Sequence, residues 1–199
     1  MRETFRTGGK AMLVLAGLVV IKGVAHWTLQ TFMPSYLQTT LHFTKVQSFV
    51  ASTVCLAVVA VAVPFAGALS DRIGRRPLLI AGTAGLILLT WPSLLLMSLG
   101  NEFLAILGMV VLGLLIAAYD GAVSATMAEL FPPRIRSGAI AIPYIIAVSL
   151  FGGTAPYIAT WLISASGYRL SPAFYVMLTA AITLVTVLRV VRETAGPRA

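Results

Sequence analysis

Three ionisable side chains, Lys22, His26 and Asp120, lie inside long apolar runs of this chain. Charged groups are costly within a membrane, so residues of this kind point first to function. Lys22 and His26 are four residues apart and therefore share one face of a helix. We expect Lys22 to bind a carboxylate, and Asp120 or His26 to take part in proton coupling. The alternative is a static ion pair between Lys22 and Asp120 that joins two helices.

Polar side chains near these three residues are further candidates for contact with a substrate. Tyr119 precedes Asp120, and Gln30 follows His26 by four residues. Tyr144 belongs to the same class. Taken singly, each of these side chains is explained more simply by a structural role, and His26 with Trp27 also fits a packing pair.

The elements that position these residues are predicted to be membrane helices. Of the 199 residues, 59% are hydrophobic and 10% are charged, whereas a soluble domain carries roughly 25% charged residues. A membrane helix needs about 20 mainly apolar residues. Six runs meet this requirement, at about 11–33, 46–69, 77–99, 103–127, 138–165 and 173–191. The sequence therefore predicts an all-α membrane protein, with residues 1–199 forming one domain of six transmembrane helices.

The basic residues predict how the helices are oriented. The net charge is +8, and most of the Lys and Arg side chains lie at the start of the chain, in alternate loops and at its end. Cytoplasmic loops collect Lys and Arg, so both termini are predicted to be cytoplasmic. An even number of spans agrees with this, because it places both termini on the same side of the membrane. The charge is thus explained by membrane orientation, and no nucleic-acid partner is expected.

One of these cytoplasmic loops carries the pattern GALSDRIGRR, at residues 67–76. Its Gly67 permits close helix approach, and its Gly74 permits a sharp turn. Asp71 is placed to accept hydrogen bonds from the amino end of a neighbouring helix. The basic members of the pattern are Arg72, Arg75 and Arg76.

The loop between the fourth and fifth predicted spans carries charges that could pair with those at residues 67–76. We expect Glu129, Arg134 and Arg136 to form a cytoplasmic gate network with Asp71 and Arg75. Solvated charges that only orient the protein are the alternative, because exposed ion pairs are worth roughly 0–1 kcal/mol.

A break is expected in the middle of the fifth span. Gly152 and Gly153 weaken the helix there, and Pro156 removes one of its hydrogen bonds. Broken helices at membrane depth face protein or a water-filled cavity. These three residues are therefore predicted to form a hinge or the wall of a site, with close packing of small residues as the alternative.

The pattern at 67–76 resembles the cytoplasmic loop signature of the major facilitator superfamily. Other stretches are similar to the metabolite:proton symporter family within it: TFMPSYL at 31–37, AELFPPRIR at 128–136, FGGTAP at 151–156 and RETA at 192–195. The resemblance covers nearly the whole chain. It implies the carboxy-terminal six-helix half of a twelve-helix transporter, with the 3+3 inverted repeat of that fold.

The resemblance also implies an activity. Members of that family carry organic acids or zwitterions such as proline and betaine, by proton symport with alternating access. It implies a bacterial inner membrane protein whose partners are a small-molecule substrate, protons and the lipid bilayer, with no cofactor. Because one half has only one wall of the site, the chain is expected to be a truncated non-transporting fragment, a split-gene half with a partner half, or a homodimer.

Enzyme activity is not expected. The sequence has no G-x-S-x-G motif of a serine nucleophile, and its spans lack the several carboxylates or the ligand cluster that a metal site requires.

Overall fold

The computed structural model describes residues 2–130 and 136–191, with side chains described from residue 12 to 130 and from 138 to 191. Within these ranges, six helical spans are long and apolar enough to cross a membrane. They are Met12–Thr39, Lys45–Ile73, Arg75–Ser98, Glu102–Glu129, Gly138–Ser166 and Pro172–Val190. The predicted class, an all-α membrane protein with six spans, is confirmed.

Two of these spans are built from shorter helical pieces. The first comprises α1 (Arg2–Trp27), a π-helical turn η1 (Thr28–Phe32) and α2 (Met33–Thr39). The fifth comprises α6 (Arg136–Ala147), a π-helical turn η2 (Val148–Gly152) and α7 (Ala155–Ser166). The other spans are the continuous helices α3 (Lys45–Ile73), α4 (Arg75–Ser98), α5 (Glu102–Glu129) and α8 (Pro172–Val190).

Local sequence explains where several helices begin and end. Thr44 and Gln47 form a capping box at the start of α3, which satisfies backbone N–H groups that the helix leaves unpaired. The Asn101 side chain accepts hydrogen bonds from the first backbone N–H groups of α5. Gly74 adopts a φ of 109° between α3 and α4, a conformation that favours glycine.

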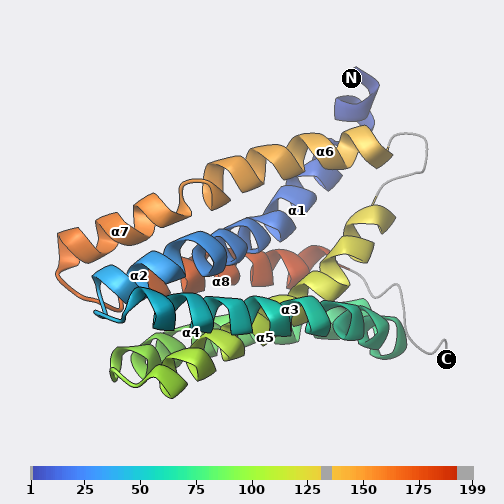
Figure 1. The fold of residues 1–199 in the computed structure, drawn as a ribbon. Helices are drawn as coiled ribbons and strands as arrows, with labels where there is room; N and C mark the ends of the chain where they lie inside the picture. The colour runs from blue at the N-terminus through green and yellow to red at the C-terminus, as the bar shows by residue number, and fades with distance from the viewer. Residues whose placement is uncertain (1, 131–135, 192–199) are drawn as a thin grey trace.

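The helices pack as one bundle, shown in Figure 1. The α6–α7 span lies along one side of α1 and α2, and α3, α4 and α5 lie on the other side. α5 packs against α3 and α4, and α8 packs against α1 and α4. The start of α1, the α3–α4 turn and the end of α5 lie at the same end of the bundle.

Small residues permit the closest helix contacts, as is usual in membranes. A Cβ atom at Gly121 of α5 would lie 2.6 Å from the backbone nitrogen of Gly67 in α3. A Cβ atom at Gly67 would lie 3.7 Å from the Gly121 carbonyl oxygen, an ordinary contact, so Gly121 is the glycine that this close approach requires. This contact joins α3 and α5 near the end of the bundle that carries the Asp71 loop.

Candidate functional site

The centre of the candidate site is an ion pair between α1 and α5. The Lys22 Nζ atom lies 3.2 Å from Asp120 Oδ1, and the side chains are 19% and 9% exposed. The other carboxylate oxygen, Asp120 Oδ2, lies 3.8 Å from His26 Nδ1. The three ionisable residues that the sequence singles out therefore meet at one place. This geometry places Asp120 where a basic group can contact each of its oxygens.

The orientation of the His26 ring is set by its neighbour one turn along the helix. Gln30 Nε2 lies 2.5 Å from His26 Nε2, and the two side chains are hydrogen-bonded. The other ring nitrogen, Nδ1, faces Asp120. Gln30 itself is exposed and lies beyond the cavity at Lys22.

A cavity of about 210 Å³ adjoins the ion pair. It is lined by Lys22, Gly23, His26, Trp27, Asp120, Tyr144 and Val148. It therefore presents an ammonium group, a carboxylate, an imidazole and two aromatic rings. The sequence alone does not predict that Trp27 lines this cavity. Its position next to an intramembrane histidine is the signal that could have indicated it.

Tyr119 points away from this cavity. Its side chain is 2% exposed, and its hydroxyl donates a 2.6 Å hydrogen bond to the Leu18 carbonyl of α1. Tyr119 is thus not among the residues that line the cavity at Lys22, although it neighbours Asp120 in sequence.

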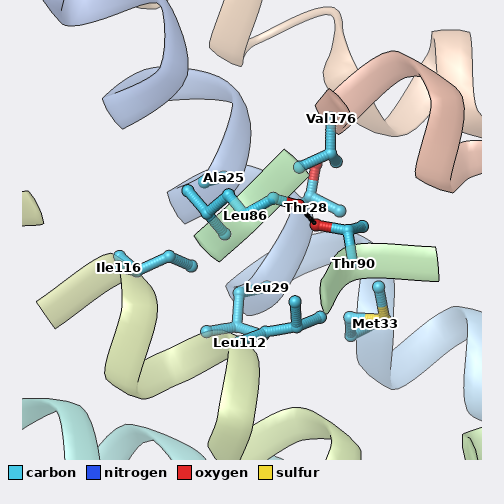
Figure 2. Close-up of a pocket in the computed structure, with 9 residues that line it drawn as sticks. All are labelled: Ala25, Thr28, Leu29, Met33, Leu86, Thr90, Leu112, Ile116 and Val176. Carbon is cyan, nitrogen blue, oxygen red and sulfur yellow. Dashed lines mark hydrogen bonds between the residues drawn. The ribbon is translucent and has the colours of Figure 1, made fainter. Parts of the chain in front are cut away.

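Deeper in the bundle, a second and much smaller cavity lies between α4, α5, α8 and the first span (Figure 2). Its volume is about 20 Å³, close to the space for one water molecule. Its lining is mostly aliphatic, and the Thr90 hydroxyl beside it donates to the Leu86 carbonyl of its own helix. The interior beside the site is therefore well packed, and of these two cavities the one at Lys22 has room for a small solute.

The exposed face of the first span changes from apolar to polar at Lys22. Beyond Lys22 this face carries polar side chains up to the end of α2: His26, Gln30, Thr31, Ser35 and Thr39. Before Lys22, an apolar groove of about 360 Å³ lies between α1 and α6. Leu13 and Ala16 line it from α1, and Ile142 and Ile146 line it from α6. The polar face thus runs from the ion pair towards one end of the bundle only.

The loop between α3 and α4 holds a network of charges. Arg75 pairs with Glu129 at the end of α5, and its Nη2 atom lies 3.6 Å from Asp71 Oδ1. The Arg75 side chain is only 14% exposed, whereas Asp71 is 67% exposed. The structure thus brings together Asp71, Arg75 and Glu129, three of the residues predicted to form a gate.

The remaining members of that predicted set are placed differently. Arg76 donates a 3.0 Å hydrogen bond to the Leu188 carbonyl near the end of α8, and Arg72 is exposed. Arg134 lies outside the described residues. Arg136 begins α6, but its side chain is outside the described part of the chain.

The fifth span is interrupted at the residues predicted to form a hinge. The turn η2 ends at Gly152, the Gly153 N–H donates to the Val148 carbonyl, and Pro156 lies in the first turn of α7. A Cβ atom at Gly152 would lie 2.7 Å from the Trp27 ring and 3.1 Å from the Gly23 backbone. The interruption therefore lies directly against the part of α1 that lines the cavity.

A metal centre is not evident in the described ranges, where no three His, Cys, Asp or Glu side chains are grouped to hold an ion.

Sequence comparisons identify relatives of the chain. The family model of the Major Facilitator Superfamily matches residues 15–199. The glycine betaine/proline/ectoine/pipecolic acid transporter OusA of Dickeya dadantii is 35% identical over 195 residues, which are 98% of this chain and 38% of OusA. The proline/betaine transporter of Escherichia coli K12 is 32% identical over 177 residues, which are 89% of this chain and 35% of that protein. The chain thus spans less than half of the length of these relatives.

Solved structures share the fold. A peptide transporter POT in complex with sulfate superposes with a TM-score of 0.74 at 16% identity, covering 90% of this chain and 37% of that one. A POT family transporter in complex with a thioalcohol-conjugated peptide also has a TM-score of 0.74 at 16% identity, covering 94% and 40%. Together with the six spans, these matches make the chain a multi-pass membrane protein with the fold of one transporter half. Its curated relatives are bacterial and are named as transporters rather than enzymes.

Proposed function

Because the chain belongs to the Major Facilitator Superfamily, we propose that it forms the substrate-binding wall of a secondary transporter for a small zwitterion or organic acid. The observation that carries this proposal is the Lys22–Asp120 ion pair, 3.2 Å long, in the wall of a 210 Å³ cavity. The names of the relatives, which include proline and betaine transporters, favour a zwitterion.

The ion pair suits a zwitterion because each of its charges has a counterpart in such a substrate. In the empty site, Lys22 and Asp120 neutralise one another, which lowers the cost of holding charges at membrane depth. A bound zwitterion would offer its carboxylate to Lys22 and its ammonium group to Asp120. Trp27 and Tyr144 line the same cavity, and aromatic faces attract alkylated ammonium groups. An organic acid would use Lys22 alone.

Proton coupling is proposed to use Asp120 and His26. Chains of Asp, Glu and His side chains form the proton relays of many membrane transporters. His26 Nδ1 lies 3.8 Å from Asp120 Oδ2, and the exposed polar face beyond Lys22 gives His26 a route to water. A proton held by His26 would leave Asp120 ionised for the ammonium group of a zwitterion, whereas a proton on Asp120 would release Lys22 for the carboxylate of an organic acid.

Alternating access is proposed to involve the two ends of the bundle separately. The apolar side chains that line the groove between α1 and α6 would exclude charged solutes in one direction from Lys22, and the polar face of α1 and α2 would admit them from the other. The Arg75 network with Asp71 and Glu129 would hold the sealed end closed. The turn η2 with Gly153 and Pro156 would let the fifth span bend. We propose that the sealed end is cytoplasmic, with both termini, because its loops are basic.

The site needs a second wall, since transporters of this fold bind substrate between two halves. We propose that a partner half or a second copy of the chain supplies it within the lipid bilayer. The alternative is a truncated fragment that does not transport. It is favoured by one observation, that the chain spans only 38% and 35% of the two relatives described above.

The test is uptake of radiolabelled proline and glycine betaine by cells that express the chain together with the partner half that supplies the second wall, called here the companion half. Lys22→Met is expected to abolish uptake and to leave membrane insertion intact. Lys45→Met is the matched control, because Lys45 is an exposed lysine at the start of α3. The double variant Lys22→Met/Asp120→Asn, which leaves no unpaired charge, distinguishes loss of the site from loss of folding. Normal uptake by Lys22→Met would remove Lys22 from the site.

A further inference from the structure

Two neighbouring backbone carbonyls of α1 accept hydrogen bonds from the side chains of other helices. The Tyr119 hydroxyl of α5 donates to the Leu18 carbonyl at 2.6 Å. The Thr183 hydroxyl of α8 donates to the Gly17 carbonyl at 2.8 Å. Both donors are buried, with 2% and 0% exposure. α1 is therefore held from two sides at consecutive residues, in a part of the bundle that is closed to water.

Thr183 differs in this respect from other threonines of the bundle. A buried threonine hydroxyl in a helix usually donates to a carbonyl of its own helix. Thr83 and Thr126 do so here, donating to the Leu79 and Ala122 carbonyls. Thr183 instead reaches across to α1. The approach of α8 is close, because a Cβ atom at Gly17 would lie 2.7 Å from the Thr186 hydroxyl.

The two carbonyls do not need these donors to be satisfied. In an α-helix the Leu18 carbonyl already accepts from the N–H group four residues later, which is that of Lys22. The extra bond from Tyr119 therefore fixes the backbone turn that carries Lys22. Tyr119 is also the neighbour of Asp120, the partner of that lysine. One pair of residues on α5 thus holds both the backbone and the side chain of the same turn of α1.

We propose that Tyr119 and Thr183 are positioning residues, which hold α1 in the register that keeps Lys22 within reach of Asp120 and of the substrate. This inference rests on the proposed function of the Lys22 site. Beyond Lys22 the first span passes into the turn η1 and an exposed polar face. The clamp formed by Tyr119 and Thr183 then fixes the turn of α1 that precedes Lys22.

The test compares two tyrosines that make the same kind of bond. Tyr119→Phe removes the donor to Leu18 and keeps the ring. Tyr36→Phe is the matched control, because the buried Tyr36 hydroxyl donates at 2.9 Å to a backbone carbonyl, that of Arg169, away from the site. Both variants lose one buried hydrogen bond, so their losses of thermal stability in detergent should be similar.

Uptake kinetics then separate positioning from stability. In membrane vesicles that carry the chain with its companion half, Tyr119→Phe is expected to raise the KM for glycine betaine about three- to tenfold, the range that the loss of one interhelical hydrogen bond allows. The maximal rate should change less, and Tyr36→Phe should keep the wild-type KM. Thr183→Val should act like Tyr119→Phe, and Thr183→Ser, which retains the hydroxyl, should restore the KM.

A second readout does not depend on transport. Hydrogen exchange of the backbone at residues 18–26 should be faster in Tyr119→Phe and Thr183→Val than in Tyr36→Phe. An equal KM in Tyr119→Phe and Tyr36→Phe would overturn the positioning role while leaving the proposed function intact. Unchanged exchange at residues 18–26 would overturn the clamp itself. Absence of uptake by the wild-type chain with its companion half would remove the proposed function, and the positioning role with it.

Discussion

Replacement of Asp120 by asparagine tests whether the ion pair with Lys22 stabilises the folded protein. The substitution keeps the size of the side chain and leaves the Lys22 ammonium group beside a neutral amide. Two unit charges 3.2 Å apart attract by about 5 kcal/mol at an effective dielectric constant near 20. Part of this attraction offsets the cost of taking both groups from water, and the Lys22 side chain keeps 19% exposure beside the cavity. We therefore expect a loss of stability of about 1–3 kcal/mol, between the values for exposed and buried pairs.

The double variant Lys22→Met/Asp120→Asn sharpens this prediction. It removes both charges, so neither is left unpaired at membrane depth. Its stability should return to within about 1 kcal/mol of the wild type, since replacing a whole buried pair by neutral groups is often harmless. The losses of stability caused by the two single substitutions should therefore be strongly non-additive in the double variant, as expected for residues in direct contact.

The chain contains its own reporter for this measurement. Cys55 is the only cysteine, and it is fully buried, with its thiol donating to the Met109 carbonyl. A maleimide dye that becomes fluorescent on reaction with a thiol should therefore report unfolding of the detergent-solubilised protein. Asp71→Asn is the control, because the Asp71 side chain is 67% exposed and should contribute little. A wild-type unfolding temperature for Asp120→Asn, or a double variant no more stable than the single one, would refute the pairing.

Two further predictions concern packing and recognition. Gly121→Ala should destabilise the bundle by about 1–3 kcal/mol, because its methyl group would meet the backbone of Gly67 and Ala66; Gly138→Ala, with open space around it, should be neutral in the same unfolding assay, and equal effects would contradict the α3–α5 contact. Trp27→Leu should weaken binding of radiolabelled glycine betaine about two- to tenfold through loss of a cation–π contact, whereas Trp161→Leu, which removes a tryptophan that lies outside the cavity at Lys22, should not; unchanged binding by Trp27→Leu would exclude the ring from the site.

The spans and the charged loop could be read from the sequence because their signals are local. Apolar runs of membrane length identify the helices, and the spacing of Asp71, Gly74 and Arg75 marks the turn between α3 and α4. Lys22 and Asp120 stand out for the same reason, since charges are rare within such runs. Their separation of 3.2 Å agrees with the expectation that they can pair.

The orientation of individual side chains could not be read in this way. A membrane helix is apolar on all sides, so hydropathy does not reveal which face packs inward. Tyr119 is a candidate for substrate contact from its sequence position, with a structural role as the simpler alternative, and only the structure shows that its hydroxyl donates to the Leu18 carbonyl. Nor was the π-helical turn Thr28–Phe32 predicted, although Pro34 just beyond it is a signal for an irregular turn. These features depend on contacts between helices distant in sequence.

The most direct test of the Lys22–Asp120 site is a structure of the protein in lipid with glycine betaine bound. The carboxylate of the ligand is expected to lie within hydrogen-bonding distance of Lys22 Nζ, with its ammonium group beside Asp120 and the Trp27 ring. A ligand bound elsewhere, with the Lys22–Asp120 ion pair undisturbed, would contradict the assignment of this pair as the substrate site.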